Sequence, residues 1–203
     1  MDFKLLLATN NQAKVGEYKS LLSELPAELV TLNEIGITTS IDETGTSLEE
    51  NARLKAVMYA AESKLVAMSD DSGLEVDALN GEPGPLSARY AGENASDRDR
   101  VGYLLSRMGG IPWERRVARF RCVIGIAMPD GRVKICSGER RGLITFEPRG
   151  GNGFGYDPIF YLPEMEQTMA ELSPEAKNQT SHRREAARKA YQVLEKLIND
   201  GTI

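Results

Sequence analysis

Apolar and polar positions alternate along the first third of the chain in a pattern that predicts strand, helix, strand, helix, strand. Short apolar runs indicate the strands, and apolar residues recurring three or four positions apart indicate the helices between them. This order is typical of an α/β protein. The expected strands are residues 3–9, 27–32 and 64–69, and the expected helices are residues 10–25 and a segment that Thr46 or Ser47 caps and that runs to about Ser63.

Two long apolar runs in the middle of the chain predict a hairpin. Residues 115–128 and 132–145 flank Asp130-Gly131, a strong turn signal. A hairpin adds antiparallel strands, so we expect a mixed sheet. The remaining expected elements are short strands at 74–79 and 159–162, loops at 80–87 and 147–158, a helix from Ser96 to Met108, a helical turn at Ser173-Pro174 and a last helix at 182–198 capped by Ser181.

The composition is that of an ordinary globular protein, with 41% hydrophobic and 27% charged residues. We expect the 203 residues to form a single domain, 1–203, built as one body or as two closely packed lobes. The formal net charge of −5 argues against a duplex-binding protein, so no nucleic-acid partner is expected.

The sequence also bears on cellular location. No apolar run reaches the roughly eighteen residues that a membrane helix needs, so no membrane partner is expected. The N-terminus does not resemble a secretory signal. Cys122 and Cys136 lack the close spacing of a metal site, and we expect them to be reduced thiols in the core of a cytoplasmic protein.

Two adjacent carboxylates, Asp70 and Asp71, follow the apolar run at 64–69, where a strand is expected to end. They are either part of a polar turn or ligands of a cation that relieves their repulsion. Carboxylate oxygens suit Mg²⁺, which usually takes one or two of them and completes its shell with water and phosphate oxygens. Asp42 and Glu43 lie just before the second helix and are free to join such a site.

Three polar segments carry groups suited to a nucleotide. Residues 8–14, ATNNQAK, are either a polar helix cap or a phosphate site at the start of the first helix. Residues 150–158, GGNGFGYDP, are either a packed turn or a loop that presents N–H groups and a ring to a planar base. Residues 177–184 place His182 and Arg183 at a helix start, where cations are unfavourable unless they face a ligand.

Six motifs in the chain are ATNNQAK, ETGTSLEENARLKA, DDSGLEVDALNGEPGPLSARYAG, FRCVIGIA, GGNGFGYDPIF and SHRREA. In their order and extent, which covers nearly the whole chain, they resemble the inosine triphosphate pyrophosphatase family. Members of this family hydrolyse non-standard purine nucleoside triphosphates such as dITP, ITP and XTP. The resemblance implies an α/β fold with a long curved mixed sheet, two lobes with a cleft between them, Mg²⁺ as cofactor and a homodimer.

The resemblance also implies which residues act. Asp71 would bind Mg²⁺ and accept a proton from the attacking water, and either Asp42 or Glu43 would share the ion. Asp70 would be a further ligand or would orient Asp71. The triphosphate would lie against Thr9, Asn10, Asn11, Gln12, Ala13 and Lys14; Ser72 would contact the substrate; and Phe154, Gly155, Tyr156, Asp157, Lys177, His182 and Arg183 would form the base pocket and its lid.

Three positions depart from the family pattern. Ser69, Asn10 and Arg184 stand where Ala, Gly and Gly are usual, and Arg184 puts the backbone geometry of the base pocket in question. Three rival functions remain: a pyrophosphatase for pyrimidine or modified nucleotides, a non-catalytic nucleotide-binding module, and an α/β interaction protein whose acids are solvated turns. The first would lack the loops at 150–158 and 181–184, and the second would have lost the acidic residues.

Overall fold

The structure is a computed structural model that describes residues 3–202. Its longer helices and strands follow the order expected from the sequence, and the α/β fold with a mixed sheet is confirmed. The strands are β1 (Lys4–Leu7), β2 (Glu28–Thr31), β3 (Val66–Val76), β4 (Val117–Ala127), β5 (Val133–Ile144), β6 (Phe160–Leu162) and β7 (Gln167–Thr168). The α-helices are α1 (Gln12–Leu21), α2 (Leu48–Ser63), α3 (Asp97–Arg107), α4 (Pro174–Thr180) and α5 (His182–Asn199).

Seven strands form one sheet in the order β2-β1-β3-β4-β5-β6-β7. β1 pairs in parallel with both β2 and β3, whereas β6 pairs antiparallel with β5 and β7. Within residues 3–202 there are also four short 3₁₀ helices for which the sequence predicted no helix, at Asp77–Leu79, Gly84–Arg89, Trp113–Arg115 and Asp157–Ile159.

One prediction about the strands is wrong. The runs at 64–69 and 74–79 are not two strands separated by a turn, because β3 continues through Asp70 and Asp71 without interruption. The parallel pairing of β1 with β3 covers Val66 to Met68 and stops there. The two aspartates therefore lie just past the carboxyl end of β1, on a strand that goes on.

The chain divides into two compact units, and β3, β4 and β5 contribute residues to both. Whether residues 1–203 act as one domain with a cleft between lobes stays a prediction. Unit 1 consists of residues 1–71, 122–138 and 183–203, and unit 2 consists of residues 72–121 and 139–182.

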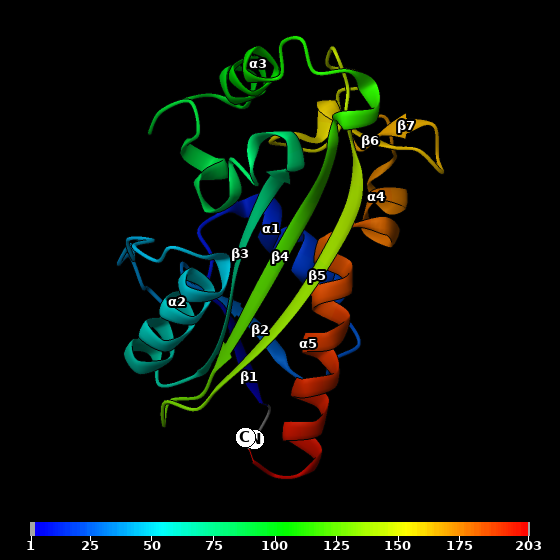
Figure 1. The fold of residues 1–203 in the computed structure, drawn as a ribbon. Helices are drawn as coiled ribbons and strands as arrows, with labels where there is room; N and C mark the ends of the chain where they lie inside the picture. Colours follow the sequence, from blue (N-terminus) through cyan, green and yellow to red (C-terminus); the bar gives the residue numbers. More distant parts are fainter. Residues whose placement is uncertain (1–2, 203) are drawn as a thin grey trace. The chain divides into compact units, whose positions relative to one another are not determined.

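Unit 1 has helices on both faces of its strands. Tyr18 of α1, Leu22 just after it, and Ala186 and Leu194 of α5 share a buried cluster with apolar residues of β1, β3 and β4. Helix α2 packs through a different cluster that includes Ala56. Figure 1 shows α2 on one side of the strands and α5 on the other.

Unit 2 has its own core. Helix α3 contributes Val101 and Leu104, which pack with Phe120 and Phe160 from β4 and β6. Ser96 forms a capping box with Asp99 at the start of α3, as the sequence predicts. Within residues 3–202, none of the helices is both long and apolar enough to span a membrane.

Side-chain caps fix where the helices of unit 1 begin. The carboxamide oxygen of Asn11 accepts the N–H of Lys14 and starts α1 later than the predicted residue 10. Of the two candidates for the cap of α2, the structure selects Ser47, whose hydroxyl accepts the N–H of Glu50 at 3.2 Å. Thr46 is instead held by the carboxylate of Glu50.

We predict that Ser47→Ala lowers the free energy of unfolding by about 1 kcal/mol, since it removes the acceptor for one otherwise unpaired helix N–H. Urea unfolding followed by circular dichroism measures this. Ser40→Ala is the control, because Ser40 is exposed and outside any helix or strand. Equal losses in the two variants would mean that the cap contributes nothing.

Candidate active site

Asp70 and Asp71 point to opposite faces of the sheet, because successive side chains of a strand alternate. Asp70 lies with Lys14 of α1, whereas Asp71 bonds with Asn51 of α2. Both side chains are buried, with residue exposures of 2% and 6%. The sequence left a polar turn or a shared cation as the reason for this pair, and the shared cation stays a prediction. In the structure each carboxylate has its own environment, and the alternation separates the two charges.

Asp70 is surrounded by cations. Its Oδ2 lies 2.9 Å from Nζ of Lys14 and 3.8 Å from Nε of Arg183. Burial by itself would raise the pKa of Asp70, but these two cations outweigh it, and the pKa falls to about 2. Asp70 is thus ionised at neutral pH, and it anchors the lysine at the start of α1.

Arg183 lies in this buried cluster. It is 2% exposed, its Nη1 donates to Oε2 of Glu17 at 2.5 Å, and its guanidinium carbon lies 5.9 Å from the centre of the Tyr18 ring. The sequence predicted Arg183 as a donor to the base, together with His182. Its observed partners are carboxylates of unit 1, so the structure ties it to Asp70 and α1.

The environment of the Cys122 thiol, beside Asp70, disfavours the thiolate form that a nucleophile needs. Sγ of Cys122 lies 3.8 Å from Oδ2 of Asp70 and 3.5 Å from the hydroxyl of Tyr18. Burial, with the charge of Asp70 adding to it, raises the pKa of Cys122 to about 12. Both Cys122 and Cys136 are buried free thiols.

Asp71 has the opposite electrostatic character. Its Oδ2 accepts Nδ2 of Asn51 at 2.9 Å. Desolvation raises the pKa of Asp71 to about 6, and the nearby carboxylate of Glu43 adds to the rise while Lys55 opposes it. A buried carboxyl group that titrates close to neutral pH is suited to accept a proton.

Lys55 joins the loop before α2 to β3. Its Nζ donates to Oε1 of Glu43 at 2.5 Å and to the backbone oxygen of Asp70 at 2.7 Å. Burial would lower the pKa of Lys55, but the surrounding carboxylates outweigh it and raise the pKa. Of the two acids that the sequence left open, Glu43 therefore belongs to this cluster, whereas Asp42 is exposed.

The carboxylates near Asp71 are candidate ligands for Mg²⁺. Among residues 3–202 there is no group of three or more His, Cys, Asp or Glu side chains arranged around one point. Mg²⁺, however, commonly takes only one or two protein carboxylates and completes its shell with water and phosphate oxygens. Asp71 supplies one hard oxygen ligand, and Lys55, which bonds both Glu43 and the backbone of Asp70, ties a second carboxylate to the same segment, so the chemistry of these two residues fits the ion.

The turn between β1 and α1 is open to solvent. Asn10, Asn11, Gln12 and Ala13 are exposed, while Thr9 is half-buried and its hydroxyl accepts the N–H of Asn11 at 3.2 Å. A helix start with accessible N–H groups favours an anion. The exposed turn is therefore compatible with a phosphate site. It is also compatible with the alternative from the sequence, a polar helix cap, because Asn11 caps α1.

In unit 2, a buried ion pair lies under the glycine-rich loop. Nζ of Lys177 lies 2.7 Å from Oδ2 of Asp157 and 4.4 Å from the centre of the Phe154 ring. The same carboxylate oxygen accepts the N–H of Phe154 at 2.9 Å. Gly153 has a φ of +79°, and a Cβ there would lie 2.1 Å from Asp157. The loop is therefore held closely against its own carboxylate.

Other residues that the sequence assigned to the substrate site contact residues of unit 2. Tyr156 is 4% exposed in the core of unit 2, and its hydroxyl donates to the backbone oxygen of Ser87. The N–H of Gly155 donates to Asp97 at 2.7 Å. His182 stacks on Phe120, with ring centres 4.9 Å apart. Ser72 is half-buried in β3.

Sequence reasoning missed three residues of unit 1. Asn51, Lys55 and Glu17 contact Asp71, Glu43 and Arg183 respectively, and none of the three was assigned a role. Asn51 and Lys55 lie within the motif ETGTSLEENARLKA, one helical turn apart, and that spacing was the available signal. Glu17 gave no signal, because it looks like an ordinary surface residue of a helix.

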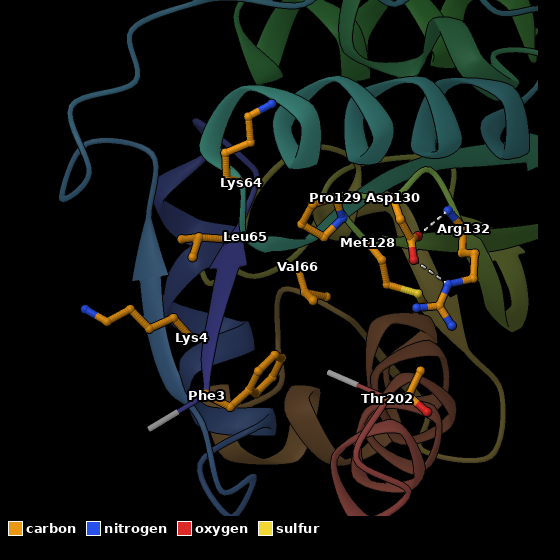
Figure 2. Close-up of a pocket in the computed structure, with 10 residues that line it drawn as sticks. All are labelled: Phe3, Lys4, Lys64, Leu65, Val66, Met128, Pro129, Asp130, Arg132 and Thr202. Atoms are coloured by element: carbon orange, nitrogen blue, oxygen red, sulfur yellow. Dashed lines mark hydrogen bonds and ion pairs between the residues drawn. The ribbon is translucent and has the colours of Figure 1, made fainter. Parts of the chain in front are cut away.

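Unit 1 also contains an open pocket of about 420 Å³ (Figure 2). None of the predicted site residues lines it. Asp130 and Arg132 form an ion pair at its edge. Its lining residues are Phe3, Lys4, Lys64, Leu65, Val66, Met128, Pro129, Asp130, Arg132 and Thr202.

The profile of the Ham1 family matches residues 5–193. The chain belongs to the Ham1 family. Relatives named dITP/XTP pyrophosphatase include a Desulforamulus reducens protein, 47% identical over 96% of each chain, and a Bacillus subtilis protein, 44% identical over 94% of this chain and 96% of the relative. The family resemblance expected from the six motifs is thus confirmed.

Solved Ham1 structures have the same fold. A HAM1 protein from Coxiella burnetii matches with a TM-score of 0.89 and 41% identity, covering 96% of this chain and 99% of that one. A nucleoside-triphosphatase, dITP/XTP pyrophosphatase, from Mycobacterium abscessus matches with a TM-score of 0.77 and 40% identity, covering 93% and 98%. The agreement extends over nearly the whole of each chain.

Proposed function

We propose that this Ham1 protein hydrolyses non-standard purine nucleoside triphosphates, ITP, XTP and their deoxy forms, to the monophosphate and pyrophosphate with Mg²⁺. This activity would remove such nucleotides before they enter DNA or RNA. Its class as a nucleoside triphosphate hydrolase is supported by the names of its relatives. The single observation that carries the proposal is the buried carboxyl group of Asp71, with a pKa raised to about 6.

The proposed chemistry uses Asp71 as proton acceptor. A buried carboxylate fixed by the amide of Asn51 can orient a water and take its proton as the water attacks the α-phosphorus. The pKa near 6 leaves the group mostly ionised at pH 7, as a base must be. No covalent intermediate is required.

The phosphates are proposed to bind at the start of α1. Residues 9–14 offer helix N–H groups to an anion, and Lys14 is held near this turn by Asp70. Mg²⁺, held by Asp71 and Glu43, would neutralise charge on the phosphate oxygens and on the departing pyrophosphate. The sequence also predicted that Asp70 binds Mg²⁺. That role stays a prediction, and the two cations beside Asp70, Lys14 and Arg183, do not favour it.

For base recognition we keep the residues that the sequence predicted, and Phe154, Lys177 and His182 among them belong to unit 2. Phe154 offers a ring, and Lys177 and His182 are candidate donors to the carbonyl at position 6 of hypoxanthine and xanthine. Adenine carries an amino group there, so donors of the site would be left unpaired. A site built on such bonds discriminates by about 10⁴- to 10⁵-fold. The role of Arg183 as a donor to the base also stays a prediction.

The test is pyrophosphate release from ITP, XTP, GTP, ATP and dUTP, each with Mg²⁺ and again with EDTA. We expect fast turnover of ITP and XTP, slow turnover of ATP and dUTP, and loss of activity with EDTA. The rate with GTP, which shares the carbonyl at position 6, shows whether the 2-amino group of guanine is rejected. Turnover of dUTP alone would favour a pyrimidine enzyme. Turnover of none of them would leave a nucleotide-binding or interaction protein. The homodimer and the cytoplasmic location stay predictions that rest on the family resemblance and the composition.

A further inference from the structure

We infer that Asn51 is a positioning residue for Asp71, and that it joins the carboxylate to the loop that carries Glu43. The expected effect on turnover rests on the proposed function, whereas the hydrogen-bonding role of Asn51 does not. The side chain is fully buried, at 0% exposure, and both ends of its amide are used. Nδ2 donates to Oδ2 of Asp71 at 2.9 Å, and Oδ1 accepts the N–H of Gly45 at 2.8 Å.

The orientation of this amide is fixed by chemistry. The N–H of Gly45 is a donor, so the atom facing it must be the oxygen of Asn51. The amino group is then left facing Asp71, where it meets an acceptor. A flipped amide would set donor against donor at one end and acceptor against acceptor at the other. Asn51 therefore holds the Asp71 carboxylate in one orientation, and this hydrogen bond occupies part of the accepting capacity of that carboxylate.

The loop is shaped around this side chain. A Cβ at Gly45 would lie 2.6 Å from Oδ1 of Asn51 and 2.7 Å from Cβ of Glu50, so only glycine permits so close an approach. Glu43 lies two residues before Gly45 and is held separately by Lys55. Asn51 thus connects, through two hydrogen bonds, the proposed base to the segment carrying the proposed second ligand.

Two substitutions of Asn51 test whether it positions Asp71 or only fills space in the core. Asn51→Asp keeps the volume and the acceptor for Gly45 but sets a carboxylate against Asp71, whereas Asn51→Ala removes both bonds. We expect kcat for ITP to fall about 100-fold in both variants, the size of effect that misplacement of a reacting group produces. KM should change less than about threefold, because the loss affects the chemical step.

The matched control is Ser69→Ala. Ser69 is also buried on β3, and its hydroxyl donates to the backbone of α2 at Ala52, 2.8 Å away, but it does not touch Asp71. Its kcat should stay within about twofold of the wild type. If Asn51→Asp folds and keeps kcat within about threefold of the wild type, or if Ser69→Ala loses as much as Asn51→Asp, the inference is wrong.

A second readout is independent of turnover and of the stability of Asn51 variants. In a ¹⁵N spectrum the side-chain amide of Asn51 should give a pair of signals protected from hydrogen exchange. We expect Asp71→Ala to shift this pair and abolish its protection, while Ser69→Ala leaves it in place. An unchanged pair in Asp71→Ala would overturn the inference. Failure of the wild type to hydrolyse ITP or XTP would instead overturn the proposed function, and the amide signals would still decide the role of Asn51.

Discussion

The Asp71→Asn variant is expected to lose pyrophosphate release from ITP by about 10²- to 10⁴-fold, the range that a positioned general base contributes. The substitution keeps the shape of the side chain and removes the group that takes the proton. Asp77→Asn is the control, since Asp77 is exposed and follows the same strand. Activity of Asp71→Asn within a few-fold of the wild type would remove Asp71 from its proposed role.

The same variant should be more stable than the wild type at pH 8 in EDTA. The pKa of Asp71 is raised to about 6 in the folded state, against about 3.9 in an unfolded chain, so folding favours the neutral acid. Its contribution to stability is present below pH 4 and is lost as the pH rises through 6. We expect the gain of the variant to grow over this window to the order of 2–3 kcal/mol.

Urea unfolding at pH 4 and pH 8 measures this difference. A gain in stability at pH 8 would mean that the buried carboxylate of Asp71 destabilises the fold while it serves catalysis. Active sites commonly show this stability–activity trade-off. If Asp71→Asn has the same stability as the wild type at both values of pH, the pKa of Asp71 is not raised in the folded protein.

Asp70→Asn should have the opposite effect on stability. The change removes the carboxylate that neutralises Lys14, whose side chain is 14% exposed, and leaves Arg183 with Glu17 as its carboxylate partner. Removing one partner from a buried ionic group costs about 3–5 kcal/mol, because the remaining charge is uncompensated. Urea unfolding at pH 7 should show this loss. The control, Asp130→Asn, breaks an ion pair whose side chains are about half exposed, and it should cost less than about 1 kcal/mol.

The pH dependence gives a further check on Asp70. Its pKa in the folded state, about 2, lies below the unfolded value, so its contribution is present above pH 4 and is lost as the pH falls toward 2. The free energy of unfolding of Asp70→Asn should therefore vary less between pH 4 and pH 2 than that of the wild type. A loss at pH 7 no greater than that of Asp130→Asn would show that the cluster does not depend on Asp70.

Much of the fold and the general position of the site could be predicted from the sequence, because they depend on local patterns. Helical spacing, the Ser96 cap and the Asp130-Gly131 turn each act within a few residues, and the structure contains the corresponding helix, cap and hairpin. The acidic motif and the turn at residues 8–14 were expected together, and Lys14 does lie beside Asp70.

The predicted end of the strand at residue 69 was wrong because distant residues decide it. The pair Asp70-Asp71 looked like the end of a strand, since two charges rarely lie inside one. Lys14 and Arg183, more than fifty residues away on either side, neutralise Asp70 and allow β3 to continue. The sequence grouped Arg183 with His182, its neighbour in the chain, and that role stays a prediction; its contacts with Glu17 and Asp70 could not be foreseen, because they join distant segments.

By itself, the sequence determined the family, the α/β class and the residues from which a nucleotide site would be built. Only the tertiary structure decided how the two aspartates divide their roles. Strand alternation sends Asp70 to a set of cations, where its pKa falls to about 2, and Asp71 to a desolvated place beside Asn51, where its pKa rises to about 6. Chemically identical neighbours differ because each pKa is set by burial and nearby charge, and these come from residues far away in the chain.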